Sequence, residues 1–573
     1  MGDFIKTQAS FANGEVAPQF FAHDNINGLA RLENMDVVAG GGLRRRRGLE
    51  SLAKLSGAGR LIPFSAGEDE DYIMLLGGKH LDIRDAKTGA RIRDITTPWP
   101  AAAISRVQCA HRFDTMIFVH PEYPPYILSR TKDSFSLVQF GFERDDATMN
   151  IAMPYMSFDD AAGVKITIAK SAKGTNYATF TTNKDFWTAD SVGTRLVAIG
   201  LQWVVSEYVS PTEVTVSVNN TFTVPSAPIA DWQESAFSNR RGWPCSITFH
   251  QDRLVFGGTP SWPSGVWMSQ VGRHRNFDVG TGLDDEAIFI TLLSERRQQI
   301  CTVVSSDNLQ ILTTDGEWAV SNKPLTPAAV DIKQHTSVGS VATTYLPPQK
   351  IEGQTVFISG NRQDIRELSL DELGETYNAN DLCALSKHLM TSPVDIAYNE
   401  DVRQLFVVMA DGNMAVLNQN SALGVSAWCR YSTTGAFRAV AVCAGKTFVV
   451  VMRDDAYYLE TFSDEALTDP DNSSFEYCAS AMPLRAAGHE ATRIRVRRIT
   501  ARVLDTKSLR INGIRPVLPN AIYADGAPGY SGDVSVSLLG TGDDTIGAPW
   551  TIGGDDALPV QILSVTVRGR YSV

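Results

Sequence analysis

The chain has few cysteines and histidines, and none occurs in a pattern typical of a metal site or of disulfide bonds. Its 573 residues include 7 Cys, with no Cys-x-x-Cys pair, and 9 His, none at the His-x-His or His-Glu-x-x-His spacing of zinc ligands. An odd number of isolated cysteines beside apolar residues indicates buried, reduced thiols. We therefore expect no disulfide framework and no metal centre.

Long apolar runs are also absent. No stretch approaches the roughly 20 apolar residues that span a bilayer. The first residues, MGDFIKTQASF, lack the basic and apolar regions of a secretory signal. We therefore expect a soluble chain, with no membrane-spanning segment, made in a reducing compartment.

Basic clusters are scarce. The chain has 52 Lys and Arg against 64 Asp and Glu, which gives a formal net charge of −12. A surface that coats nucleic acid needs clustered Lys and Arg, so this balance argues against such a surface. The run Arg44–Arg47 invites a nucleic-acid or localisation role, but a solvated turn, or pairing with acids of a neighbouring subunit, explains such a run more often. A second group, Arg493–Arg498, lies in an alternating strand pattern, and we expect it to pair with acids across a subunit interface.

Motifs of catalysis are missing as well. No G-x-G-x-x-G, G-x-x-x-x-G-K-S/T or G-x-S-x-G stands between a strand and a helix. His250 lies in strand-rich sequence and is expected to be a hydrogen-bonded structural histidine. The turn at Asp315-Gly316 comes near the Asp-box of sialidase propellers, which repeat that box, whereas this chain has it once. Adjacent acids that could serve glycoside hydrolysis lie in polar, turn-like settings: Asp159-Asp160, Asp284-Asp285-Glu286 and Asp543-Asp544. We expect no enzyme activity and no cofactor.

Short β-runs joined by tight turns dominate what is present. Within Gly242–Phe277, the runs Cys245–His250 and Arg253–Gly257 flank the polar pair Gln251-Asp252, and a Pro/Gly-rich turn leads to a third run, Val266–Gln270. This pattern predicts a blade of antiparallel sheet. Similar units recur on both sides, roughly seven in all, which predicts a β-propeller made of residues 51–142 and 241–465.

Three segments depart from this rhythm. Residues 143–240 carry a β-pattern that resembles small SH3-like barrels and predict an inserted domain. Residues 466–573 include a long alternating strand, Thr492–Leu504, and predict a C-terminal β-sandwich. The sequence of residues 1–50 predicts an arm that is needed for docking to neighbours rather than for folding. Within it, a short helix is predicted, capped by Asp24 and with Ile26, Leu29, Leu32 and Met35 on one face. A second helix is predicted over Asn380–Leu389.

Several short motifs stand out by their order and spacing. They are Ser10-Phe11, Gly14-Glu15, Pro18, Gly40-Gly41, Arg44–Gly48, Arg60–Phe64, Val119–Pro121, Gly242–Pro244, Phe249, Gln251–Leu254, Gly257–Pro260, Asp315–Trp318, Leu325–Pro327 and Ala397-Tyr398. Together they resemble the tail nozzle protein of short-tailed bacteriophages, also called tail tubular protein B or stabilisation protein. The resemblance runs from residue 10 to about 465 and, more loosely, to the C-terminus. One departure is that the family often has Arg-Arg-Pro-Gly where this chain has Arg46-Arg47-Gly48.

The resemblance implies a structural protein of the virion tail, assembled in the host cytoplasm. Family members form a ring, typically hexameric, below the adaptor (head-to-tail connector) ring. Tail fibres or spikes are their further binding partners. The ring retains the packaged genomic DNA, which passes through its channel during ejection. We expect a neutral-to-acidic channel, and binding of duplex DNA no tighter than about millimolar, because tight non-specific binding needs many phosphate contacts. The alternative is a receptor-binding tailspike whose propeller binds or cleaves glycan. The residues expected to dock the arm are Phe11, Gly14, Glu15, Pro18, Arg44, Arg45, Arg46 and Arg47.

Overall fold

The structure is a computed structural model of the chain. It describes all residues except 1, 22–25, 68–69, 133, 147, 372–375, 471–473, 484–492, 520–521, 523–526, 539–546 and 573. Strands hold 54% of the residues and helices 4%, so the prediction of a mainly β protein is confirmed. None of the described helices has the length and apolarity needed to cross a membrane. They are short 3-10 helices: η1 (Pro18–Phe20), η2 (Ala101–Arg106), η3 (Asp159–Ala161), η4 (Ala189–Ser191), η5 (Lys387–Leu389) and η6 (Ser421–Leu423).

Contacts within the chain define two compact units. The first comprises Met1–Gly77, Leu81–Asp94 and Leu346–Val573, and the second comprises Gly78–His80 and Ile95–Tyr345. Both are built from sheets whose neighbouring strands are mostly antiparallel and consecutive in the chain. This is the topology that short runs joined by tight polar turns produce.

The second unit contains three four-stranded sheets. The first strand of one sheet packs against the first strand of the next, β11 against β22 and β22 against β26. Buried apolar side chains such as Val255, Val266 and Ile311 fill the space between successive sheets. The strands are β11 (Gln108–Arg112), β12 (Thr115–His120), β13 (Tyr123–Thr131) and β14 (Ser134–Gln139); β22 (Ser246–His250), β23 (Arg253–Gly257), β24 (Gly265–Met268) and β25 (Ile288–Thr291); and β26 (Ile300–Ser305), β27 (Leu309–Thr313), β28 (Glu317–Val320) and β29 (Ile332–Thr336).

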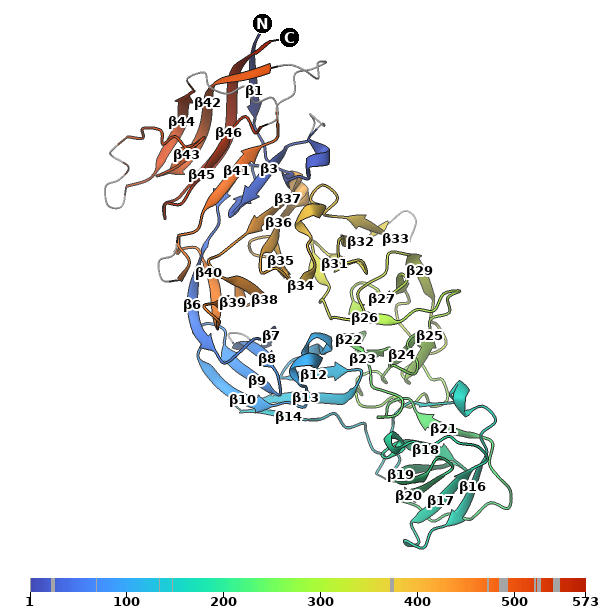
Figure 1. The fold of residues 1–573 in the computed structure, drawn as a ribbon. Coiled ribbons are helices and arrows are strands. Elements are labelled where there is room, and N and C mark those ends of the chain that lie inside the picture. Colours follow the sequence, from blue (N-terminus) through green and yellow to red (C-terminus); the bar gives the residue numbers. More distant parts are fainter. Residues whose placement is uncertain are drawn as a thin grey trace. The chain divides into compact units, whose positions relative to one another are not determined.

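Between β14 and β22 the chain forms a seven-stranded sheet, coloured blue-green to green in Figure 1. Its core is its own, with Trp187, Trp203 and Trp232 buried among valines of the strands. Such a core lets a segment fold as a separate layer. In sheet order the strands are β15 (Tyr155–Met156), β21 (Trp232–Ser235), β18 (Arg195–Ala198), β19 (Leu201–Ser210), β20 (Glu213–Val218), β17 (Tyr177–Thr182) and β16 (Ile166–Lys170).

The first unit contains four further groups of four strands. Their first strands also pack in succession, β30 against β34, β34 against β38 and β38 against β7. One group takes its fourth strand from the start of the chain, because β6 pairs with β40. The strands are β30 (Gln349–Ile351), β31 (Gln354–Ile358), β32 (Ile365–Asp371) and β33 (Thr376–Asp381); β34 (Pro393–Asn399), β35 (Gln404–Met409), β36 (Met414–Asn420) and β37 (Val425–Tyr431); β38 (Ala436–Cys443), β39 (Lys446–Arg453), β40 (Ala456–Ser463) and β6 (Gly48–Leu55); and β7 (Arg60–Gly67), β8 (Glu70–Gly77), β9 (His80–Asp85) and β10 (Arg91–Thr96).

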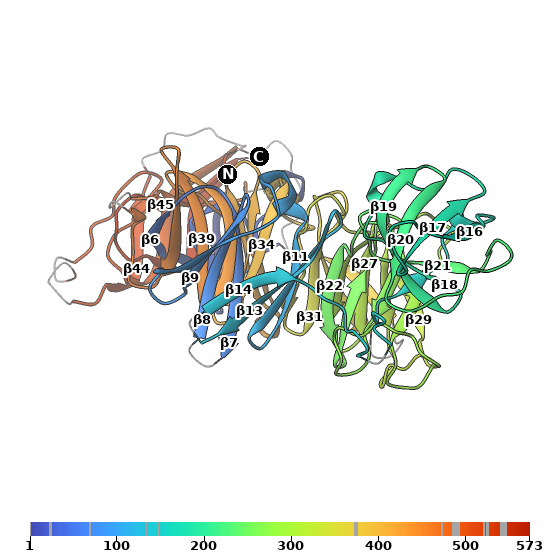
Figure 2. The same ribbon diagram turned by 90° about the horizontal axis from the view of Figure 1, so that it is seen from below.

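The two ends of the chain are built into two larger sheets of this unit. A nine-stranded sheet has the order β34-β35-β36-β37-β2-β3-β41-β45-β43, and a six-stranded sheet has the order β4-β5-β46-β42-β44 with β1 also paired to β46. The N- and C-termini consequently lie side by side (Figures 1 and 2). The added strands are β1 (Gly2–Gln8), β2 (Gly14–Glu15), β3 (Gly28–Glu33), β4 (Met35–Val37), β5 (Leu43–Arg45), β41 (Tyr477–Ala481), β42 (Arg493–Thr506), β43 (Arg510–Ile511), β44 (Tyr530–Ser537), β45 (Thr551–Gly554) and β46 (Gln561–Ser572).

The helix predicted within residues 1–50 is wrong. Its apolar positions Leu29, Leu32 and Met35 are fully buried, but they belong to the strands β3 and β4. Strand β3 pairs with β2 on one side and with β41 on the other, and these non-local hydrogen bonds override the helical spacing. The expected cap, Asp24, lies outside the described residues.

The second predicted helix, Asn380–Leu389, is also wrong. Strand β33 continues to Asp381, and only the single turn η5 forms at the end of the stretch. The backbone N–H of Cys383 donates to the Asp381 carboxylate at 3.0 Å, and the N–H of Leu382 donates to the carbonyl of Ile365 at 2.9 Å. Local side-chain capture of this kind competes with the hydrogen bonds of a helix.

Candidate functional site

The arginine run is divided between solvent and core. Arg44 is exposed, whereas Arg45 and Arg46 are 3% and 0% exposed. The Arg46 guanidinium binds both carboxylate oxygens of Asp469, at 3.0 and 2.9 Å, and lies 3.5 Å from the ring centroid of Phe475. Arg45 lies over the same ring at 4.3 Å. The buried pair therefore joins the start of the chain to the segment after β40.

Glu15 is the centre of a second buried cluster. Its carboxylate is 1% exposed and accepts hydrogen bonds from the Leu32 N–H at 2.8 Å, from His388 at 2.8 Å and from Arg430. Burial opposes ionisation, but the hydrogen bonds from His388 and Arg430 outweigh it, so the pKa of Glu15 is lowered. The charge holds β2 against its neighbours.

Most of the residues predicted to dock the arm are therefore not available to a partner. Phe11 is fully buried, with its ring edge-on to Trp550 at 6.1 Å. Gly14 has φ +60°, and a Cβ there would lie 2.4 Å from the backbone of Trp428. Together with Glu15, Arg45 and Arg46, these residues are buried within the fold, where they contact other parts of the same chain. Arg47 is only partly exposed, and the docking prediction stays open for it and for the exposed Pro18 and Arg44.

The stretch Gly242–Phe277 brings distant motifs together. Gln251 and Asp252 both have positive φ, 44° and 58°, as a two-residue hairpin turn requires. Arg253 is fully buried and donates to the carbonyls of Ser269 at 2.8 Å and of Leu325 at 3.4 Å. The Leu325 N–H in turn donates to the Gln251 side chain at 2.8 Å. Two motifs about 70 residues apart thus form one structural contact.

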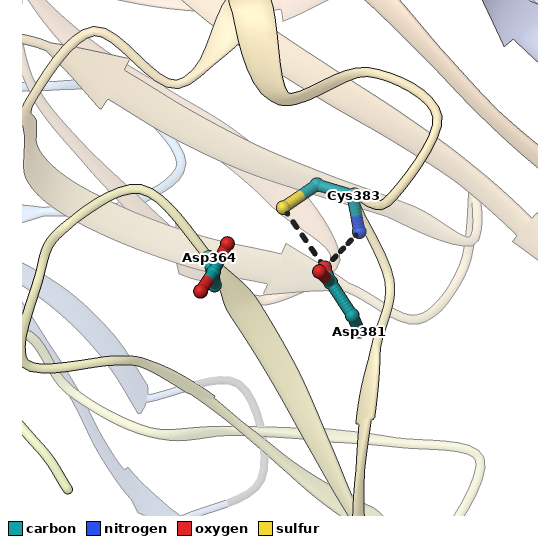
Figure 3. Close-up of side chains that lie close together, drawn as sticks. All are labelled: Asp364, Asp381 and Cys383. Carbon is teal, nitrogen blue, oxygen red and sulfur yellow. Dashed lines mark hydrogen bonds between the residues drawn. The ribbon is translucent and has the colours of Figure 1, made fainter. Parts of the chain in front are cut away.

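A group of side chains with the composition of a metal site lies where β32 begins and β33 ends (Figure 3). Ligand atoms of Asp364, Asp381 and Cys383 lie within 4.8 Å of one another. The Lys387 ammonium already binds Asp364 at 2.6 Å and Asp381 at 3.0 Å, and burial raises the pKa of the Cys383 thiol to about 12. A metal would have to displace Lys387 and a bound proton, so the geometry is that of a charge-paired turn.

The cysteines show no disulfide. All 7 are free, six of them buried and Cys109 partly exposed. Burial raises the pKa of Cys245 and Cys443 to about 11, which leaves these thiols protonated and unreactive. The prediction that the thiols are buried holds for six of the seven.

Two of the adjacent acids noted in the sequence are bound to partners within the fold. Asp160 binds Arg241 through both oxygens, at 3.0 and 2.9 Å. Glu286 accepts the backbone N–H groups of Thr281 and Leu283, at 2.7 and 2.8 Å, and so closes its own loop. Asp543-Asp544 lie outside the described residues. His250 is 5% exposed and hydrogen-bonded to Ser305 at 2.9 Å, which confirms its structural role.

A basic face that the sequence shows only in part lies on the six-stranded sheet. The arginines of β42 were visible as a group, but Arg568 and Arg570 of β46 are paired with them in the structure. Strand β1 adds Asp3 and Ile5 to the same face. Strand β1 ends at Gln8 and β46 begins at Gln561, so no local pattern in the sequence brings these two strands together; the alternating arginines at Arg568-Gly-Arg570 are a local signal of this face.

Comparisons with known proteins add solved structures only. No family model matches the chain, and no curated protein matches it. Similar solved structures include the WD40 domain of Pan2 from Neurospora crassa (10% identity, 74% of this chain and 96% of that chain, TM-score 0.28). BamB from Moraxella catarrhalis has 10% identity over 73% of this chain and 98% of its own, with a TM-score of 0.34. The computationally designed protein Ika8 has 11% identity over 72% and 99%, with a TM-score of 0.35. These TM-scores are too low to support an argument, so the fold class rests on the topology of the chain's own sheets.

Proposed function

We propose that this chain is the tail nozzle subunit of a short-tailed bacteriophage, a structural and non-enzymatic virion protein. In this proposal it is a seven-bladed propeller with an inserted SH3-like barrel and a C-terminal sandwich. Six copies form a ring below the adaptor ring, with fibres or spikes as further partners. The ring retains packaged DNA and conducts it during ejection.

The seven-bladed architecture is supported by the way the sheets pack. Seven groups of four antiparallel strands occur in the two units. Within each unit the first strands of successive groups contact one another, β11-β22-β26 and β30-β34-β38-β7. Blades of a propeller pack in this way around an axis. The fourth strand that β6 adds to β38–β40 also corresponds to the ring closure common among propellers, in which the two ends of the chain share a blade.

The observation that carries the functional proposal is the role of the motif residues. Gln251, Arg253 and Leu325, which belong to the motifs of the resemblance, bind one another in the fold. A Cβ at Gly242 would lie 2.4 Å from the Pro260 ring, so these two motif residues fit only together. Because these motif residues contact one another in the fold, they support an architecture shared with the nozzle family rather than a chance match of short sequence motifs.

The glycan-binding alternative has a single feature in its favour. Phe113 is 74% exposed at the tip between β11 and β12, where an aromatic ring could stack on a sugar. The nearest carboxylates, Asp114 and Asp252, are occupied by Arg130 at 2.7 Å and Arg112 at 2.5 Å. Glycoside hydrolysis needs two carboxylates free to act on one bond, which this tip does not offer.

Two measurements on the purified chain separate the candidates. Sedimentation velocity at micromolar concentration should show a species of about six subunits, on its own or after addition of an adaptor ring. A glycan array should show no binding that Phe113→Ala removes. A chain that stays monomeric with and without the adaptor and binds a glycan through Phe113 contradicts the nozzle proposal.

A further inference from the structure

One face of the six-stranded C-terminal sheet is exposed and basic. Residues paired directly across antiparallel strands lie on the same face. Strand β46 pairs Arg570 with Arg495 and Arg568 with Arg498, and all four are exposed. A register shift between Val496 and Arg498 lets the arginines at 495 and 498 share this face despite their odd spacing.

The opposite face of the same strands is the core. Ile499, Val503 and Val567 are 0%, 1% and 3% exposed and pack in the main apolar cluster of the first unit. Gly569 lies beneath the ring of Phe4, where a Cβ would approach to 2.7 Å. The basic face is therefore held on a rigid, fully packed sheet.

Two acids of the described residues bind arginines of this sheet face. Asp3 binds Arg570 at 2.6 Å, and Asp533 binds Arg502 at 2.9 Å. Among the described residues, neither Arg498 nor Arg568 has a carboxylate within salt-bridge distance. Ile5, paired with Arg568 on the same face, is 65% exposed.

Like charges directly opposite each other destabilise a sheet, so the contacts of the described residues do not account for the Arg498–Arg568 pair. We propose that this face docks onto an acidic surface of a second copy of the chain. The inference rests on the proposed function, since it names the surface through which neighbouring subunits of the ring meet. The contact is heterologous, basic face to acidic face, which is the kind of contact that closes a ring.

The net charge of the chain and the side chains of the basic face favour a second copy of the chain as the binding partner. The net charge is −12 although this face is basic, so the rest of each copy is more acidic than the whole. A duplex would be repelled by that acidic remainder, whereas a second copy offers acidic surface that can meet the basic face at short range. Arginines around an exposed apolar side chain are typical of protein interfaces, whereas phosphate binding makes no use of Ile5.

The test uses a variant in which the sheet is not weakened. In R495E/R498E each new glutamate faces an arginine of β46, so the positive charge of the face is lost while the fold gains two cross-strand ion pairs. The midpoint of thermal unfolding should be unchanged or higher than that of the wild type. By sedimentation velocity, the apparent association constant should fall at least tenfold.

The matched control is R93E/R297E, which makes the same change in net charge at two exposed arginines outside this sheet. It should assemble like the wild type. In addition, Arg568→Lys allows a carbodiimide to couple the new amine to a carboxylate in contact with it. The coupled peptides, identified by mass spectrometry, should join the amine introduced at position 568 to an Asp or Glu of another copy.

The outcomes separate this inference from the proposed function. If the wild type forms rings and R495E/R498E forms them equally well, the docking face is wrong while the nozzle proposal stands. If the wild type binds duplex DNA at micromolar concentration and R495E/R498E loses that binding but still assembles, the face is a nucleic-acid surface and the inference fails. A wild-type chain that never associates contradicts both.

Discussion

Buried arginines hold distant parts of this chain together at the scale of single residues. The two terminal nitrogens of Arg253 donate to backbone carbonyls, including those of Ser269 and Asp284, each at 2.8 Å. Arg46 instead forms an ion pair with Asp469 in which both side chains are fully buried. Removing one partner of such a pair leaves an uncompensated charge in a medium that solvates it poorly.

Arg46→Met should therefore destabilise the first unit by about 3–5 kcal/mol. The measurement is urea denaturation followed by tryptophan fluorescence. Arg44→Met is the matched control, because Arg44 is exposed two positions away and its loss should change stability by no more than about 0.5 kcal/mol. Equal midpoints for the two variants would show that the buried pair does not stabilise the fold.

Asp395 gives the same unit a pH dependence. Burial raises its pKa from 3.8 to about 6, although the N–H groups of Ile396 and Val440 each donate to the carboxylate at 3.0 Å. Between these two pKa values the folded state binds more protons than the unfolded state. The stabilising contribution of this group is therefore full below pH 3.8 and is lost as the pH rises through about 6.

Asp395→Asn should remove that dependence. The difference in unfolding free energy between wild type and variant should favour the wild type more at pH 4 than at pH 7. The change has an upper bound of about 3 kcal/mol, from about 1.4 kcal/mol per pKa unit. Urea denaturation at pH 4, 5, 6 and 7 measures it. A difference independent of pH would mean that Asp395 stays charged in the folded protein.

At the scale of elements, the first 50 residues are strands of the core rather than an arm. Phe11, Leu29 and Leu43 are fully buried in the main apolar cluster. Deleting residues 1–48 should therefore leave no folded first unit, whereas an arm that serves only for docking, as the sequence predicted, could be removed without loss of folding. Deleting only residues 2–8 removes the edge strand β1 and should leave a cooperative unfolding transition. Circular dichroism melting compares the two, and a cooperative transition in the longer deletion would restore the arm interpretation.

Two excisions test which residues of the segment after β14 belong to the insertion. Strands β15 and β21 pair Met156 with Glu234, so an Asn-Gly turn can replace residues 157–233. That excision should preserve the cooperative unfolding of the neighbouring sheets. The wider excision of 145–240 should abolish it, because it also removes Met153, Met156 and Phe237, which pack in the core of the adjacent sheets. If both excisions unfold alike by calorimetry, the seven-stranded sheet is not separable.

Local chemistry explains which elements the sequence predicted. The strands around Gln251-Asp252 and the long strand β42 follow from alternating side chains and turn residues only a few positions apart. The helix over Ile26–Met35 was wrong because its competing partner, Ala481 on β41, is about 450 residues away. The buried pair Arg46–Asp469 and the basic face depend in the same way on contacts that no local pattern encodes.

At the scale of the whole molecule, the chain combines a net charge of −12 with a basic sheet face. An acidic protein that must let a polyanion pass without holding it has this balance, because each added phosphate contact increases affinity. In the proposed ring, the basic face docks onto a neighbouring copy, and the acidic remainder of the chain keeps the channel from holding DNA.

Electron microscopy of the purified full-length chain, in negative stain at moderate salt with and without an adaptor ring, tests this account most directly. We predict class averages of a closed ring with about sixfold symmetry and an axial channel. The radial features of each ring in the class averages should match the four-stranded sheets of the subunits. Isolated monomers under both conditions, or an assembly without an axial channel, would contradict the nozzle proposal.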